Sequence, residues 1–190
     1  NVTITGSLPA NVTVIYTQQS IPDDVGDKIS NEADAPTLQD AVNAAAAAEK
    51  GGTVTLEKNI KLDKAVTVPA GQTVTITAEQ ACQIAGTKTA GDLKNLFVVE
   101  KGGSLVIAGQ VTLFGRYNTG SIVLNYGALE LTGEAVVTGS KITSDRANGT
   151  SSSGLGVIDS RGEGAVFTLS GGKIADNALK SRRPSGLRKT

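Results

Sequence analysis

The chain has 190 residues, which is long enough for one domain with a hydrophobic core. Aromatic residues make up only 3% of it, and tryptophan, methionine and histidine are absent, which argues against a sandwich built around large rings and favours a solenoid of stacked aliphatic side chains. The net charge is zero, but residues 178–190 hold five basic and no acidic side chains, so residues 1–177 are acidic, which argues against a nucleic-acid partner.

The first elements are expected to be two short strands, a linker and a helix. Residues 1–17 alternate apolar and polar side chains around a turn, which indicates strands that either begin this domain or end a preceding module. Residues 18–35 are polar and are interpreted as a linker. Residues 37–49 are rich in alanine, which favours an α-helix. Its apolar stripe consists of Leu38, Ala41, Val42 and Ala45.

From residue 53 onwards the pattern changes to a period of two. Alternating runs at 53–56, 59–62, 65–68 and 73–76 are separated by short corners. An Asn-Gly pair, the usual mark of a tight hairpin, occurs only once, at 148–149. The pattern therefore indicates a chain that keeps bending in one sense, so that successive coils pair in parallel.

The second half repeats one unit three times, at residues 100–113, 125–137 and 161–174. Each unit has a glycine, a strand, a corner with a further glycine, and a second strand. A glycine at the corner permits a positive φ without a Cβ clash. The leading glycines are expected to be equivalent from coil to coil and lie at positions 71, 103, 127 and 164. Loops of variable length are expected on one side, at 85–95, 115–120 and 140–156.

These patterns predict an all-β chain folded as a right-handed, single-stranded parallel β-helix over residues 36–177, with the helix 37–49 as its N-terminal cap. Residues 178–190 form a basic irregular tail with few apolar side chains, so we expect the last coil to lie open, to fray, or to self-associate end to end. The side chains expected to point inward are Val54, Leu56, Ile60, Leu62, Val66, Val68, Val74, Ile76, Leu105, Ile107, Val111, Leu113, Leu129, Leu131, Phe167, Leu169 and Ile174.

Several segments resemble a known family. Residues 37–42 followed by 51–54 resemble the N-terminal cap and first coil of pectate-lyase-like right-handed β-helices. Residues 66–76 and 167–177 resemble a rung and a repeat of large surface proteins from Gram-positive gut bacteria. The resemblance covers residues 36–177 and implies a secreted or cell-surface protein. It says little about activity, because lyases, hydrolases, adhesins and spacers share this scaffold.

The chain contains no start methionine, no signal peptide and no run of about 18 apolar residues that could span a membrane. We therefore expect it to be part of a longer or processed protein whose anchor lies outside these residues. Cys82 has no second cysteine or histidine with which to form a disulfide or a zinc site, and it is interpreted as a small buried apolar residue. No metal or cofactor site is expected.

Two groups of side chains are candidates for a site. The resemblance implies that an enzyme would need clustered aspartates and a basic residue, and the best match is Asp145, Arg146, Asp159 and Arg161. We favour a solvated ion pair here, because no adjacent coil supplies a second pair of aspartates. The second group combines rings, a cation and an amide, as glycan sites do, although packing within the loop or of a ring stacked on the rung is the favoured explanation. It consists of Arg116, Tyr117, Asn118 and Tyr126.

Two functions remain open at this stage. The favoured one is a non-catalytic extracellular β-helix module of a bacterial surface protein, an adhesin or rigid stalk whose side loops contact host or cell-wall glycans or surface proteins. The alternative is part of a carbohydrate-active enzyme, a polysaccharide lyase or glycoside hydrolase whose catalytic coils are missing or degenerate.

Overall fold

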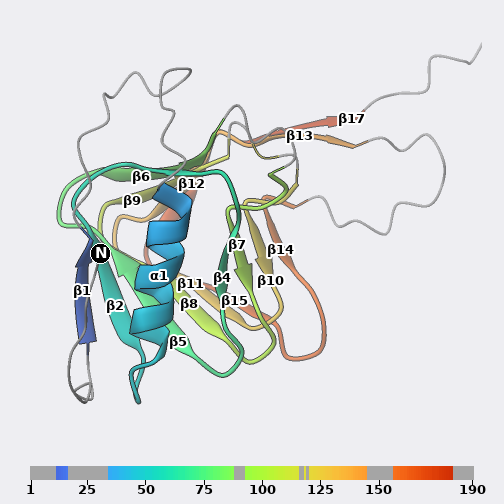
Figure 1. Ribbon diagram of the computed structural model, residues 1–190. Coiled ribbons are helices and arrows are strands. Elements are labelled where there is room, and N and C mark those ends of the chain that lie inside the picture. Colours follow the sequence, from blue (N-terminus) through green and yellow to red (C-terminus); the bar gives the residue numbers. More distant parts are fainter. Residues whose placement is uncertain are drawn as a thin grey trace, which may run out of the picture.

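The computed structural model describes residues 12–16, 34–87, 93–115, 118, 120–144 and 156–181. Over these residues the chain winds into a right-handed parallel β-helix with one short α-helix (Figure 1). The strands expected before residue 12, most of the linker and the end of the basic tail lie outside the described residues.

Three parallel sheets form the walls of the β-helix. Sheet A consists of β1 (Val12–Tyr16), β2 (Gly52–Leu56), β5 (Thr73–Thr77), β8 (Ser104–Ile107), β11 (Ala128–Leu131) and β15 (Val166–Leu169). Sheet B consists of β3 (Ile60–Leu62), β6 (Cys82–Gly86), β9 (Val111–Phe114), β12 (Val136–Thr138) and β16 (Lys173–Ile174). Sheet C consists of β4 (Val66–Val68), β7 (Phe97–Val99), β10 (Val123–Asn125) and β14 (Ile158–Ser160). A small fourth sheet pairs β13 (Lys141–Ser144) with β17 (Ala178–Ser181).

Each coil runs from sheet A to sheet B to sheet C, and its strands pair in register with the same strands of the next coil. Ile76 is paired with Ile107, and Ile107 with Leu131, so their side chains stack inside the same wall. From β2 onwards, the longest connections between strands of the three sheets all join sheet B to sheet C, between β6 and β7, β9 and β10, and β12 and β14.

Fourteen of the seventeen predicted inward residues, from Val54 to Leu131, are buried. The other three lie in β15 and β16, the last strands of sheets A and B, where Phe167 is partly buried, Leu169 is 50% exposed and Ile174 is 39% exposed. Leu169 and Ile174 are paired with the buried residues Leu131 and Val137, so they occupy inward positions of the ladder. They are exposed because no described coil stacks on them. The prediction missed several core residues, namely Ile84, Leu96, Phe97, Val99, Ile122, Val123, Ala135 and Val137.

Glycine lies in three of the corners between sheets A and B, and the positive φ expected there is found in two of them. Gly109 and Gly133 have φ of 59° and 63°, whereas Gly171 has no positive φ. The predicted equivalence of the leading glycines is wrong by one residue at two positions. The strand register places Gln72, not Gly71, opposite Gly103, and Ala165, not Gly164, opposite Gly127. Corner lengths differ between coils, so counting from the glycines shifts the alignment.

The α-helix α1 (Asp34–Ala46) begins and ends three residues earlier than the predicted 37–49. Pro36 lies in its first turn, where a backbone N–H has no helical acceptor and proline is tolerated. The end of the predicted helix is replaced by tight turns, in which the N–H of Ala48 donates to the carbonyl of Ala45. The predicted stripe is confirmed, since Leu38, Ala41, Val42 and Ala45 are all buried.

Helix α1 packs against the first coil and closes that end of the β-helix (Figure 1). The side-chain amide of Gln39 replaces a neighbouring strand at the outer edge of β4. Its Nε2 donates to the carbonyl of Thr67 at 2.9 Å, and its Oε1 accepts from the N–H of Thr67 at 2.7 Å. Sheet A is closed at the same end by β1, which pairs with β2. Different elements therefore satisfy the first edges of sheets A and C.

The pairing of Gln39 with Thr67 makes a direct prediction. Gln39→Leu should lower the free energy of unfolding by about 1–3 kcal/mol, because both backbone groups of Thr67 lose their partners at a partly buried position. Denaturant unfolding measures the change. Asp40→Asn, at the next position on the exposed face of the helix, serves as the control and should change stability little. Equal stability of the two variants would contradict this role for Gln39.

A second prediction concerns the core. Ile107 is completely buried in the middle of the ladder of sheet A. Ile107→Ala should cost about 2–5 kcal/mol, because it removes buried methyl groups and leaves a cavity. Ile174→Ala, at an inward position of the open end, should cost distinctly less. Equal losses would show that the last strands are covered.

Candidate ligand-binding groove

The residues that follow the strands of sheet C form a row across three coils. The backbone N–H groups of Glu100, Tyr126 and Arg161 donate to carbonyls of the preceding coil, those of Val68, Val99 and Asn125, at 2.8–3.0 Å. Glu100, Tyr126 and Arg161 therefore hold the same ladder position on successive coils, about 4.8 Å apart. A carboxylate, a phenol and a guanidinium follow one another along the outer wall.

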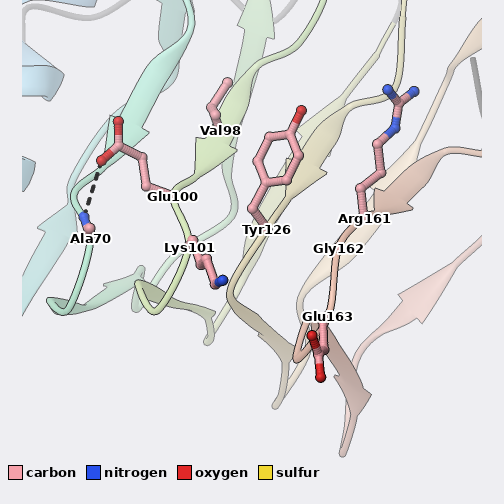
Figure 2. A pocket seen from close by; sticks show the side chains of 8 residues that line it. All are labelled: Ala70, Val98, Glu100, Lys101, Tyr126, Arg161, Gly162 and Glu163. Atoms are coloured by element: carbon pink, nitrogen blue, oxygen red, sulfur yellow. Dashed lines mark hydrogen bonds between the residues drawn. The ribbon is translucent and has the colours of Figure 1, made fainter.

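A groove of about 470 Å³ lies along this row (Figure 2). The corner from β10 to β11 has only two residues, Tyr126 and Gly127, whereas the corners before and after it, 100–103 and 161–165, are longer. The longer corners form the rims, and Tyr126 stands between Glu100 and Arg161 (Figure 2). The groove is lined by Ala70, Val98, Glu100, Lys101, Tyr126, Arg161, Gly162 and Glu163.

The charged side chains of the groove are partly fixed by neighbours. Arg161 contacts Asp159 through two nitrogens, with Nε to Oδ2 at 2.8 Å and a terminal nitrogen to the same oxygen at 2.5 Å. This hydrogen bond and the charge of Asp159 raise the pKa of Arg161 further above its usual value. Oε2 of Glu100 accepts from the backbone N–H of Ala70 at 3.2 Å. With Lys101 and Glu163, the lining carries two cations and two carboxylates, so its charge is balanced.

The side chain of Asn125 fixes the short corner by hydrogen bonds on its buried side. Its side chain is completely buried, and its Oδ1 accepts from the N–H of Gly127 at 3.0 Å. Its Nδ2 donates to the carbonyl of Val166 at 2.8 Å and to Oγ of Ser160 at 3.1 Å, both in the next coil. The side chain therefore ties the floor of the groove to the coil that carries Arg161.

Gly127 makes the short corner sterically possible. A Cβ at this position would lie 2.7 Å from the carbonyl oxygen of Glu100 and closer still to that of Gly103. Both are backbone atoms, which cannot move without disturbing the neighbouring coil. Only glycine lets the two corners approach this closely.

The predicted site residues fall into different places. Tyr126 and Arg161, which the sequence assigned to two separate candidates, meet in the one groove. Asp159 does not line the groove; it is 9% exposed and is the partner of Arg161. Asn118 lies at the other end of β10 and does not line the groove. It is 5% exposed, and its Nδ2 donates to the carbonyls of Lys94 and Gly120. Arg116, Tyr117, Asp145 and Arg146 lie outside the described residues.

The sequence reasoning missed Glu100, Lys101 and Glu163 as lining residues. Their common signal is their position in a corner that leads from a strand of sheet C into sheet A. Recognising it requires the strand register, because the corners differ in length.

Cys82 is buried, and its Sγ lies 3.6 Å from the carbonyl oxygen of Leu56, which confirms the interpretation as a small core residue. Burial, and then the charge of Glu57, raise the pKa of the thiol. Both effects disfavour the thiolate, the form that acts as a nucleophile. Among the described residues, no group of three or more acidic, cysteine or histidine side chains is placed to bind a metal ion.

No helix in the described part of the chain has the length and apolar character needed to cross a membrane. Comparison of the chain with models of protein families, with characterised proteins and with solved structures found no match.

The groove leads to a prediction about its floor. Gly127→Ala should destabilise the protein by more than about 2 kcal/mol and displace Tyr126, because its Cβ meets backbone atoms. Gly162→Ala, in the neighbouring corner that forms a rim of the groove, is the matched control. Its Cβ would meet nothing within 4 Å, so only its φ of 89° is strained, at about 1–2 kcal/mol. Denaturant unfolding compares the two variants, and a smaller effect of Gly127→Ala would contradict the close approach.

Proposed function

We propose that the chain is a non-catalytic β-helix module of a bacterial surface protein, and that it binds glycans through the groove around Tyr126. The observation that carries this proposal is the aromatic ring set between a carboxylate and a guanidinium on one wall. An aromatic face offers an apolar surface to the C–H side of a sugar ring. The flanking Glu100 and Arg161 supply an acceptor and several donors for hydroxyl groups.

The balanced charge of the lining favours neutral sugars over strongly acidic ones. Arg161 is already engaged by Asp159, which leaves less of its charge for a uronate or sulfate group. The side chains of Glu100, Tyr126 and Arg161 follow one another at about 4.8 Å per coil, which is similar to the length of one sugar unit. A short oligosaccharide lying along this row would therefore contact neighbouring coils. The resemblance to surface proteins of gut bacteria supports host or cell-wall glycans as the source.

The rigid-stalk role is part of the same proposal. Every described coil is hydrogen-bonded in register to the next, and the core is continuous from the helix to β12. Such a rod holds the groove at a fixed distance and orientation from its ends.

Glycan binding can be tested with the full chain and defined probes. Neutral xylo- and cello-oligosaccharides, mucin O-glycans and oligogalacturonates would be titrated by calorimetry or NMR. We expect a neutral or mucin-type probe to bind, Tyr126→Ala to weaken it about tenfold, and Tyr126→Phe to retain most of the affinity. Thr75→Ala, on the outer face of β5, is the control. Equal affinity of Tyr126→Ala and the unaltered chain would reject the groove.

The absence of catalysis is a separate prediction. Incubation with polygalacturonate, alginate and mucin glycans should release neither unsaturated nor reducing ends. Turnover that is lost in Asp159→Asn or Arg161→Ala would contradict this prediction and favour the alternative of a polysaccharide lyase or glycoside hydrolase.

A further inference from the structure

The two ends of the β-helix are finished differently. At the first coil, α1, β1 and the amide of Gln39 cover the strand edges. At the other end β14, β15 and β16 are the last strands of sheets C, A and B, and each has one unpaired edge within the described residues. We call these three strands, residues 158–174, the terminal turn.

The terminal turn exposes both apolar side chains and backbone groups. Leu169 and Ile174 point inward in the ladder yet are 50% and 39% exposed. In β15, the N–H groups of Val166 and Ser170 donate to Gly127 and Leu131 of the preceding coil. Backbone groups alternate in direction along a strand, so those of Phe167 and Leu169 point to the open side. The open edge of β15 therefore offers backbone donors and acceptors with the same spacing as the edge of β11 to which β15 itself is bonded.

We propose that two copies of the chain dimerise through the terminal turn, with β15 of each copy paired antiparallel across a two-fold axis at Thr168. This register places Phe167 of one copy opposite Leu169 of the other. Phe167 and Leu169 are the two residues of β15 whose backbone groups point to the open side. Each of the two Phe167–Leu169 pairs would form two hydrogen bonds, four in all, and the contact would cover the exposed ends of the ladders that contain Leu169 and Ile174.

Three observations favour a second copy as the occupant. The first coil carries α1 across its end, so it cannot stack on the terminal turn of another copy, whereas two terminal turns present matching open edges to each other. The strand β15 has no charged residue, so pairing with itself brings no like charges together. The two-fold axis places β14 opposite β16 of the second copy, where Asp159, which is also the partner of Arg161, has a charge opposite to that of Lys173. A two-fold contact closes on itself, so the assembly stops at a dimer.

The oligomeric state of the full chain tests this proposal. Sedimentation equilibrium should show a dimer, and Leu169→Lys should raise its dissociation constant at least about tenfold, because it places a charge in the covered ladder. Thr75→Lys, on the outer wall of an inner coil, should leave the dimer unchanged. A monomer at about 0.1 mM, or growth beyond the dimer, would overturn the proposal.

A cysteine on the axis tests the register itself. Thr168 is exposed, and in the proposed register it faces Thr168 of the second copy as a non-hydrogen-bonded pair, with the two Cα atoms about 4.5 Å apart, a separation that a disulfide can bridge. Thr168→Cys should form a covalent dimer under mild oxidation. Thr75→Cys, at the same ladder position on an inner coil, and the unaltered chain with its buried Cys82 should not. A dimer in solution that Thr168→Cys does not cross-link would overturn the antiparallel register.

Discussion

The backbone hydrogen bonds between successive coils determine which side chains of the described strands point inward and which point outward. A strand displaced by one residue would turn its inward side chains to the solvent, so each coil must copy the register of the one before it. The ladder from Val54 through Ile76 and Ile107 to Leu131 is one result, and all four residues are buried. The row of Glu100, Tyr126 and Arg161 is the outer counterpart of the same rule.

The same constraint makes the ends of the stack the weak points. A parallel strand needs neighbours on both edges, and a coil at the end has only one. At the first coil, the protein satisfies β4 with a single glutamine side chain, which supplies a donor and an acceptor at strand-like spacing. Nothing equivalent covers β15 among the described residues, and the exposed Leu169 marks this difference. In-register pairing of successive coils therefore explains both the groove on the outer wall and the open edges of the terminal turn.

The sequence predicted the fold because inward positions admit little besides aliphatic residues, and the alternation at residues 53–76 is regular. It missed β6 and β7 as separate strands. In β6, Ile84 is the only large aliphatic residue beside Cys82, Ala85 and Gly86, so the period of two is faint. The helix boundary was misplaced because the predicted helix began only after Pro36, although the first turn of a helix tolerates proline.

The groove was harder to predict than the fold. Tyr126 and Arg161 were noticed separately, but their ladder position depends on the number of residues in each corner. Counting back from Gly103 and Gly127 sets Tyr126 opposite Gly102, whereas the strands of sheet C set it opposite Glu100. The two alignments differ by two residues because the corner 100–103 is two residues longer than the corner 126–127. No local pattern reveals that difference, because it arises only when both neighbouring strands are paired.

The long connections of the β-helix all leave from sheet B and return to sheet C. Their lengths can change without altering any strand register, because each begins and ends at a paired strand. A coil therefore behaves as a building block with a constant rise of about 4.8 Å and one site that tolerates inserted sequence. Peptides grafted into these sites would be displayed in a line along a single edge of the rod, at intervals set by the backbone alone.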